Sequence, residues 1–211
     1  MFDVYLQELL AWNKKFNLTA ITKSEEIKIK HFEDSLALRQ ALRLTKQSVI
    51  DIGTGAGFPG IPLKIVCPEI KLTLLEATKK KTEFLKHIVS TLNLKGVDIV
   101  WGRAEDLAKD KRESFDLAVA RAVANLNILS ELCLPFVKVG GQFIAYKEDK
   151  VEAEVEVAAN TIKTLGGELQ EIKKVILPGS DIVRSLIIIK KVSPTPAKYP
   201  RRAGVANKNA L

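Results

Sequence analysis

The stretch VIDIGTGAGFPGIPLKIV, residues 49–66, holds four glycines and two prolines between two apolar runs. Glycine loses more conformational entropy on folding than any other residue, so a loop this rich in it needs a physical reason. A ligand that approaches the backbone closely is such a reason. An apolar strand before a glycine-rich loop, with a helix after it, is the nucleotide-binding turn of doubly wound α/β proteins. The ligand of this loop therefore decides what the protein does.

The apolar runs on both sides of the loop predict a parallel sheet. Short apolar runs indicate strands at 48–53, 71–77, 97–102, 115–122 and 140–148. Helical patterns separate them, at 60–66, 78–94, 104–109, 125–137 and 150–165. Such alternation is typical of a doubly wound sheet.

The end of the chain departs from this alternation. Two strand patterns, 168–177 and 183–192, are joined by PGSD with no helix between them, which predicts an antiparallel hairpin at the sheet edge. A mostly parallel, Rossmann-like sheet that ends in such a pair is characteristic of class I S-adenosylmethionine-dependent methyltransferases. The expected fold class is therefore α/β of this type, with an N-terminal helical extension.

Three segments of one structural domain follow from this pattern. A helical stripe over 3–16, a break at NLTAIT and a second helical pattern at 23–42 form an N-terminal extension, residues 1–45. The methyltransferase core is expected at 46–192, and a basic C-terminal tail at 193–211.

Composition indicates a globular cytoplasmic protein. The chain has 211 residues, of which 46% are hydrophobic, and no run of the length and apolarity of a membrane span. Its beginning does not read as a signal peptide, because acidic residues interrupt the apolar ones. Cys67 and Cys133 have no metal-site or disulfide spacing, so we interpret them as buried thiols and expect no metal.

The charge of the chain favours a polyanionic partner. Lys and Arg number 33 against 25 Asp and Glu, a formal net charge of +8. Residues 190–211 contain six basic residues and no acidic ones. We expect this tail to contact RNA through Lys198, Arg201, Arg202 and Lys208.

The glycine loop leaves two cofactors open. Read as Gly55-x-Gly57-x-x-Gly60, it satisfies the dinucleotide fingerprint, while the phosphate loop GxxxxGK[ST] is absent. A nicotinamide dinucleotide and S-adenosylmethionine both need an acid at the end of the second strand, for a ribose diol, and Glu76 fills that position. The run Lys79–Lys81 could accept the ribose phosphate of NADP, but Glu76 would repel it, so we interpret the run as a solvated helix face.

Three features favour S-adenosylmethionine. Asp51 precedes Gly53, Gly55 and Gly57 in the arrangement Asp-x-Gly-x-Gly-x-Gly, which is commonest in methyltransferases. The segment GRAEDL, 102–107, follows the third strand, where backbone amides and an acidic side chain meet an adenine edge. The terminal hairpin suits the same fold.

Several segments together resemble one family. They are WNKKFNLTAI (12–21), HFEDSLAL (31–38), VIDIGTGAGFPGIPLKIV (49–66), RAEDL (103–107), ARAVA (120–124) and YPRRAG (199–204). In order and spacing they are similar to the glucose-inhibited division protein B family, which are small-subunit ribosomal RNA guanine-N7 methyltransferases. The resemblance extends from about residue 5 to 207. It implies methyl transfer from S-adenosylmethionine to N7 of a guanosine in 16S ribosomal RNA.

The resemblance also implies cofactor contacts at five positions, which are Gly53, Phe58, Ala104, Glu105 and Arg121. Glycine amides can approach the cofactor without a Cβ clash, and Phe58 offers an apolar wall. Arg121 ends the fourth strand, where its guanidinium could hold a carboxylate or a phosphate at the mouth of the cleft.

Guanine N7 carries a lone pair and no proton, so its methylation needs no general base. The sequence accordingly offers no obvious catalytic dyad, and positioning is expected to supply the catalysis. Candidate substrate-positioning residues are Arg121, Lys147, Asn17 and His31. His31 and Asp34, one helical turn apart, could form a hydrogen-bonded pair that orients the extension over the cleft.

Two other functions stay open from the sequence. One is a nicotinamide-dependent oxidoreductase, and the other is a nucleic-acid-binding protein with a vestigial cofactor site. For the methyltransferase, the expected partner is small-subunit ribosomal RNA, either free or in the 30S subunit or an assembly intermediate. We expect a monomer that does not bind membranes.

Overall fold

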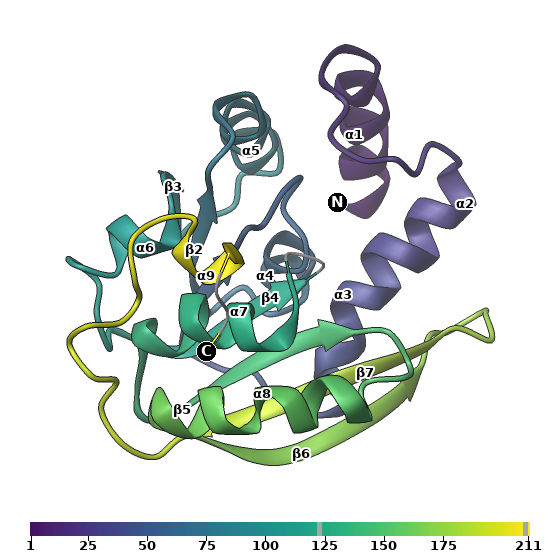
Figure 1. Cartoon of the computed structure of the whole chain (residues 1–211). Helices are drawn as coiled ribbons and strands as arrows, with labels where there is room; N and C mark the ends of the chain where they lie inside the picture. Colours follow the sequence, from purple (N-terminus) through teal and green to yellow (C-terminus); the bar gives the residue numbers. More distant parts are fainter. Residues whose placement is uncertain (122–123, 209–210) are drawn as a thin grey trace.

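The computed structural model describes residues 1–121, 124–208 and 211, and for 207 and 208 it describes the backbone alone. Its centre is a seven-stranded sheet with the strand order β3-β2-β1-β4-β5-β7-β6 (Figure 1). The strands are β1 Ser48–Ile52, β2 Lys71–Glu76, β3 Val97–Trp101, β4 Phe115–Arg121, β5 Val137–Lys147, β6 Gly167–Ile176 and β7 Val183–Lys191. The chain thus forms the α/β sheet that the alternating pattern predicts.

Strand pairing confirms the predicted direction of every strand. The first five strands pair in parallel, and β1 lies between β2 and β4. β7 is antiparallel to β5 and to β6, so the terminal hairpin closes the sheet with β6 at its edge. β1 and β4 are neighbours although two strands separate them along the chain, which creates a crevice at their carboxyl ends.

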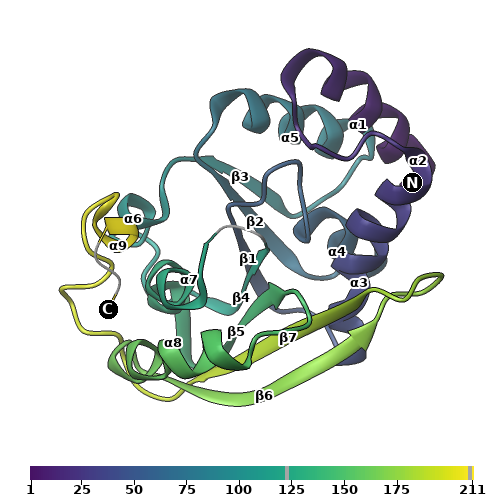
Figure 2. The same ribbon diagram turned by 45° about the vertical axis from the view of Figure 1, so that its right-hand side comes forward.

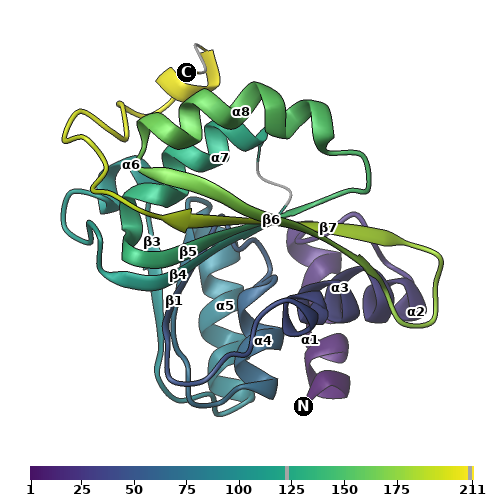
Figure 3. The same ribbon diagram turned by 90° about the horizontal axis from the view of Figure 1, so that it is seen from below.

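Helices cover both faces of the sheet (Figure 3). One face carries α1 Phe2–Phe16, α2 Ser24–Ile27, α3 Asp34–Leu36, α4 Gly60–Val66 and α5 Lys79–Thr91. The other carries α6 Ala104–Leu107, α7 Leu126–Cys133, α8 Glu152–Thr164 and α9 Val205–Lys208. None of the helices in these described ranges has the length and apolar character that crossing a bilayer requires.

Alternation along the strands divides the core in two. In β4, Leu117 and Val119 belong to the cluster beneath α1, α4 and α5, whereas Ala118 and Ala120 belong to the cluster beneath α7 and α8. Successive strand residues point to opposite faces, and both faces of a parallel sheet are buried. This is why the central strands are mostly apolar.

Two expected elements differ in detail. The predicted helix 125–137 ends earlier, in a 3-10 turn Leu134–Phe136 (η3), and β5 begins at Val137, before the predicted strand start at 140. The predicted helix 23–42 is divided by a π-helical segment Lys28–Glu33 (η1) and ends in a 3-10 turn Ala37–Gln40 (η2). The π-helical segment holds His31 and leads directly into Asp34.

The tail after β7 is fastened to the body of the protein. The Arg112 guanidinium donates to the carbonyls of Thr195, Pro196 and Tyr199. Tyr199 is itself 6% exposed and belongs to the core beneath α7 and α8. The tail thus returns along the α6 and α7 side of the sheet and ends in α9 (Figure 2).

Candidate active site

The glycine loop is held from within by Asp51. Its Oδ2 accepts hydrogen bonds from Thr54 Oγ1 at 2.6 Å and from the Gly60 amide at 2.7 Å, which closes the loop around one carboxylate. A Cβ on Gly60 would come within 2.8 Å of the same oxygen. The Asp51 side chain is 0% exposed, so its visible role is to shape the loop.

Burial is also the main influence on the chemistry of Asp51. It raises the pKa of this carboxyl to about 6, against the hydrogen bonds from Thr54 and Gly60, which lower it. The second oxygen, Oδ1, is buried and has no hydrogen-bond partner among the described residues. The loop therefore rests on an acid whose charged form the interior disfavours.

Two other loop glycines take left-handed backbone conformations for different reasons. Gly57 has φ +101°, and a Cβ there would lie 2.5 Å from Ile61 Cδ1 and 2.6 Å from the Tyr5 hydroxyl. Gly55 has φ +62° but faces open space, with nothing closer to a Cβ than the Gly53 carbonyl at 4.0 Å. Packing thus requires glycine at 57, whereas at 55 only the backbone conformation does.

Glu76 joins the loop to the end of β2. The Gly55 amide donates to its Oε2 at 3.0 Å, and the Thr78 amide donates to its Oε1 at 2.7 Å. Each oxygen keeps a further lone pair for another donor. The carboxylate thus lies beside the loop with acceptor capacity to spare, where the sequence expects a ribose acceptor.

A cleft of about 170 Å³ opens at the carboxyl ends of β1, β2 and β3, and we call it the cofactor cleft. Three predicted cofactor residues line it, Gly53 and the first two residues of α6, Ala104 and Glu105. The structure thus brings the end of the first strand and the RAEDL segment together, about 50 residues apart along the chain.

Phe58 forms the centre of an aromatic stack. Its ring lies parallel to Tyr5, with centroids 5.3 Å apart, and to His31, with centroids 4.6 Å apart. The Arg121 guanidinium carbon lies 5.1 Å from the centre of the same ring. Phe58 is 5% exposed, so the predicted apolar wall is packed mainly against protein groups.

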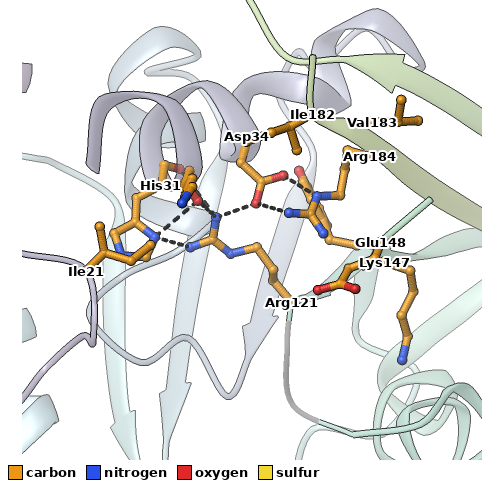
Figure 4. A pocket seen from close by; sticks show the side chains of 11 residues that line it. Ile21, His31, Asp34, Arg121, Lys147, Glu148, Ile182, Val183 and Arg184 are labelled. Carbon is orange, nitrogen blue, oxygen red and sulfur yellow. Dashed lines mark hydrogen bonds and ion pairs between the residues drawn. The ribbon is translucent and has the colours of Figure 1, made fainter. Parts of the chain in front are cut away.

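A second cavity of about 640 Å³ lies between the N-terminal helices and β4, β5 and β7, and we call it the basic cavity (Figure 4). Its centre is Asp34, whose side chain is 2% exposed. Asp34 Oδ2 accepts from Arg121 Nη1 at 2.9 Å, and Arg184 donates from Nε to Oδ1 at 2.6 Å and from Nη2 to Oδ2 at 3.0 Å. One buried carboxylate thus holds two guanidiniums from β4 and β7.

His31 and Asp34 do not form the hydrogen-bonded pair that their spacing allows, because Arg121 lies between them. Arg121 Nη2 is 3.3 Å from His31 Nδ1, while His31 Nε2 is 2.7 Å from Thr19 Oγ1. No hydrogen bond joins the two side chains directly, and both are among the described residues. Burial, followed by the charge of Arg121, lowers the pKa of His31 to about 4, so the ring is neutral near pH 7.

The two remaining positioning candidates lie apart from this cluster. Lys147 lines the basic cavity, but its ammonium donates to Glu154 Oε1 at 2.6 Å and to the Ala124 carbonyl at 2.7 Å. Asn17 caps the end of α1 in a left-handed backbone conformation, and its backbone N–H donates to the Asn13 carbonyl. The structure places Asn17 on an exposed helix end and not in the lining of either cavity.

The predicted RNA-binding residues of the tail have unequal surroundings. Arg201 forms a two-pronged ion pair with Glu131, whose side chain is 1% exposed. Arg202 is exposed, and the Lys198 ammonium lies 5.2 Å from the centre of the Tyr199 ring. The side chain of Lys208 lies outside the described residues, as do residues 122 and 123 of the ARAVA segment.

Sequence reasoning missed Arg184 and Glu131. Each is a charged residue in an apolar stretch, the first at the start of the strand VRSLIIIKK and the second in the helix LNILSELC. A charged side chain at a buried position needs a partner, so a charge within an apolar stretch indicates a buried ion pair. The identity of the partners was not in the local sequence, because both partners are distant along the chain.

The sheet order, the glycine loop at the switch point and the acid at the end of β2 define a class I S-adenosylmethionine-dependent methyltransferase. Solved structures share this fold, including M. jannaschii TYW2 in complex with AdoMet (TM-score 0.60, 15% identity, 74% of this chain and 75% of that chain). Precorrin-6y C5,15-methyltransferase from Geobacter metallireducens is similar as well (TM-score 0.57, 17% identity, 81% of this chain and 90% of that chain).

Sequence comparison then gives the family. The GidB family model, described as rRNA small subunit methyltransferase G, matches residues 1–183. Ribosomal RNA small subunit methyltransferase G of Thermoanaerobacter sp. (strain X514) is 51% identical, over 100% of this chain and 89% of that protein. The protein of the same name from Staphylococcus carnosus is 47% identical, over 100% of this chain and 89% of that protein. The chain belongs to the GidB family, as its motifs predicted.

Proposed function

We propose that this chain methylates N7 of a guanosine in 16S ribosomal RNA, acting in the cytoplasm on free RNA or on the small subunit. The observation that carries the choice of substrate is the match to proteins named ribosomal RNA small subunit methyltransferase G, over the whole of this chain. Because that match spans 100% of this chain, it includes both the cofactor cleft and the basic cavity.

The residues of the cofactor cleft fit S-adenosylmethionine, which when bound supplies an electrophilic sulfonium methyl group. Glu76 would accept from the ribose hydroxyls through the lone pairs that Gly55 and Thr78 leave free. Gly53, Ala104 and Glu105 would contact the rest of the nucleoside from the cleft wall. Asp51 would act as a positioning residue, since its own side chain is buried beneath the loop.

The basic cavity supports a nucleophile that has no proton to lose. Asp34 is neutralised by two guanidiniums, and His31 has a lowered pKa and is engaged by Thr19 and Arg121. Neither group is placed to remove a proton from a substrate. Guanine N7 attacks with a lone pair, so positioning of the base and exclusion of water suffice.

Arg121 would connect the two regions. Its guanidinium covers Phe58 and contacts the N-terminal extension through the Lys30 carbonyl at 3.1 Å, while its strand ends beside the glycine loop. We propose that it aligns the reacting groups. Lys147 would support the wall of the cavity by holding Glu154, which also accepts from the Leu126 amide at 2.6 Å.

Methyl transfer can be tested directly. The purified chain is incubated with methyl-labelled S-adenosylmethionine and either 16S ribosomal RNA or 30S subunits from a strain that lacks the enzyme. The RNA is then digested to nucleosides. We expect the label in 7-methylguanosine. Label in another nucleoside would reject the N7 assignment, and label in neither RNA would reject the substrate.

A further inference from the structure

A patch of lysines and aromatic rings lies where the end of α1 meets the start of α5. α1 ends in Lys14, Lys15 and Phe16, and α5 begins with Lys79, Lys80 and Lys81. Trp101, the last residue of β3, is 61% exposed, and Phe16 is 37% exposed. We call these five lysines and two rings the lysine–aromatic surface.

The two helices form one surface because they pack against each other (Figure 2). Trp12 of α1 lies 5.6 Å from Phe84 and 4.9 Å from His87 of α5, measured between ring centroids. The Lys80 ammonium lies 6.0 Å from the centre of the Phe16 ring, and the Lys79 ammonium lies 5.6 Å from that of Trp101. Cations and rings thus alternate across the helix junction.

No carboxylate neutralises this surface within the described part of the chain. None of its five lysines forms an ion pair there, and the nearby acids are engaged elsewhere, Glu83 with Lys86 at 3.2 Å and Glu8 with His87 at 2.6 Å. The first turn of α5 has no acidic residue. Cations at a helix N-terminus oppose the helix dipole, so three lysines there do not serve the stability of α5.

The lysine–aromatic surface adjoins the cofactor cleft. Trp101 pairs in register with Glu76, and its Nε1 donates to the Ala77 carbonyl at 3.0 Å. Ala77 in turn lines the cofactor cleft. An RNA strand that crosses this surface would therefore lie beside the cleft, at the carboxyl ends of the strands.

We propose that the lysine–aromatic surface holds unpaired RNA next to the target guanosine, with bases stacked on Trp101 and Phe16 and phosphates against the lysines. The inference rests on the proposed function and assigns it a binding surface. Alternating aromatic faces and unpaired cations are the arrangement that binds single strands, whereas charge alone would suit any polyanion. A guanine N7 is accessible only in an unstacked or looped segment, which is the form this surface fits.

The lysines are tested with K79Q/K80Q/K81Q and a matched control, K71Q/K95Q/K111Q. The control removes the same charge from three exposed lysines near the amino ends of β2, β3 and β4. Binding of protein-free 16S ribosomal RNA is measured against salt concentration. We expect the first variant to lose up to about two units of salt slope, at roughly 0.7 per single-strand phosphate contact, and the control to keep the wild-type slope. Equal losses in both variants would overturn the proposal.

The rings are tested with W101L and W101F. Loss of a stacked base weakens RNA binding about fivefold or more, so W101L should bind more weakly while W101F, which keeps an aromatic face, recovers most of the affinity. Equal affinity of W101L and wild type would overturn the stacking role. If the lysine variant bound protein-free RNA normally and lost only 30S binding, the partner would be a ribosomal protein and the proposal would be wrong.

The wild-type protein separates this inference from the proposed function. If it neither binds nor methylates 16S ribosomal RNA, the proposed function itself fails. If it methylates the RNA and K79Q/K80Q/K81Q binds as tightly and with the same salt slope, only the assignment of this surface fails.

Discussion

The cofactor cleft and the Asp34 cluster in the basic cavity are neighbours that the chain builds in opposite ways. The glycine loop is held by contacts close along the chain, from Gly60 to Asp51 and from Gly55 to Glu76, separated by 9 and 21 residues. The Asp34 cluster joins Arg121 and Arg184 across separations of 87 and 150 residues. Local contacts leave a motif that can be recognised in the sequence, whereas distant contacts do not.

The two regions also differ in what holds them. The loop depends on backbone conformation and on space for glycine, and the cluster depends on a buried carboxylate shared by two cations. Removing one partner of a buried ion pair leaves an uncompensated charge. The cluster should therefore be the more sensitive of the two to a single substitution.

The largest effect is expected for Asp34→Ala. This change leaves Arg121 and Arg184 buried without their common counter-charge, and we expect a loss of about 3–5 kcal/mol in the free energy of unfolding. Urea unfolding measures it. Asp149→Ala is the matched control, because its partner Lys174 is half exposed and an exposed pair contributes at most about 1 kcal/mol. Similar losses in the two variants would show that Asp34 has no special role.

This contrast explains how much of the molecule the sequence could predict. The parallel core of the sheet, the terminal hairpin and the acid at the end of β2 follow from periodicity and spacing, which act over short distances along the chain. The partners of Asp34 and Arg201 could not be predicted, because Arg184 and Glu131 reach them only through the sheet order and the path of the tail. A count of charges has the same limit, because it does not show which lysines are buried. Lys191 of the basic C-terminal region is buried, bonded to the Leu134 carbonyl at 2.8 Å.

The next effect is on the pH dependence of stability, which the two regions change in opposite directions. The folded-state pKa of Asp51 is about 6, above its ordinary value of 3.8, so between about pH 4 and 6 the folded state holds a proton that the unfolded state has released. The titration of Asp51 therefore makes the folded state less stable as the pH rises. The pKa of His31 is about 4, below 6.5, so here the unfolded state holds the extra proton and stability increases with pH over nearly the same range.

The two groups thus oppose each other, and single variants should reveal each. At about 1.4 kcal/mol per pKa unit, each contributes about 3 kcal/mol over the range. Relative to wild type, Asp51→Asn should gain stability as the pH rises from 4 to 6.5, and His31→Asn should lose it. Urea unfolding at several pH values gives the comparison. Parallel pH profiles for all three proteins would contradict both assigned pKa shifts.

The glycine positions give a smaller effect within the loop. Gly57→Ala must adopt φ +101° and meet Ile61 and Tyr5, so we expect a loss of about 2–3 kcal/mol in unfolding free energy. Gly55→Ala has open space and only the backbone cost, about 1 kcal/mol. If Gly55→Ala proved the more damaging change, the packing of the loop would differ from the one described.

The smallest effect is on cofactor affinity. Glu76→Gln keeps the size of the side chain but removes its charge, and we expect S-adenosylmethionine to bind about 1–2 kcal/mol more weakly, as measured by calorimetry. The same substitution should have little effect on a cofactor analogue without ribose hydroxyls. An equal loss for that analogue would mean that Glu76 acts through the loop and not on the ribose.

The central claim is that positioning alone, without a general base, drives methyl transfer to guanine N7. The single-turnover rate of methyl transfer to 16S ribosomal RNA, with cofactor and RNA saturating, tests it most directly between about pH 7 and 8.5, above the pKa of Asp51. His31 has already lost its proton below this range, and N7 has none to lose. We predict a rate that does not change with pH. A rate that rises about tenfold per pH unit would show that a proton must be removed and would contradict the claim.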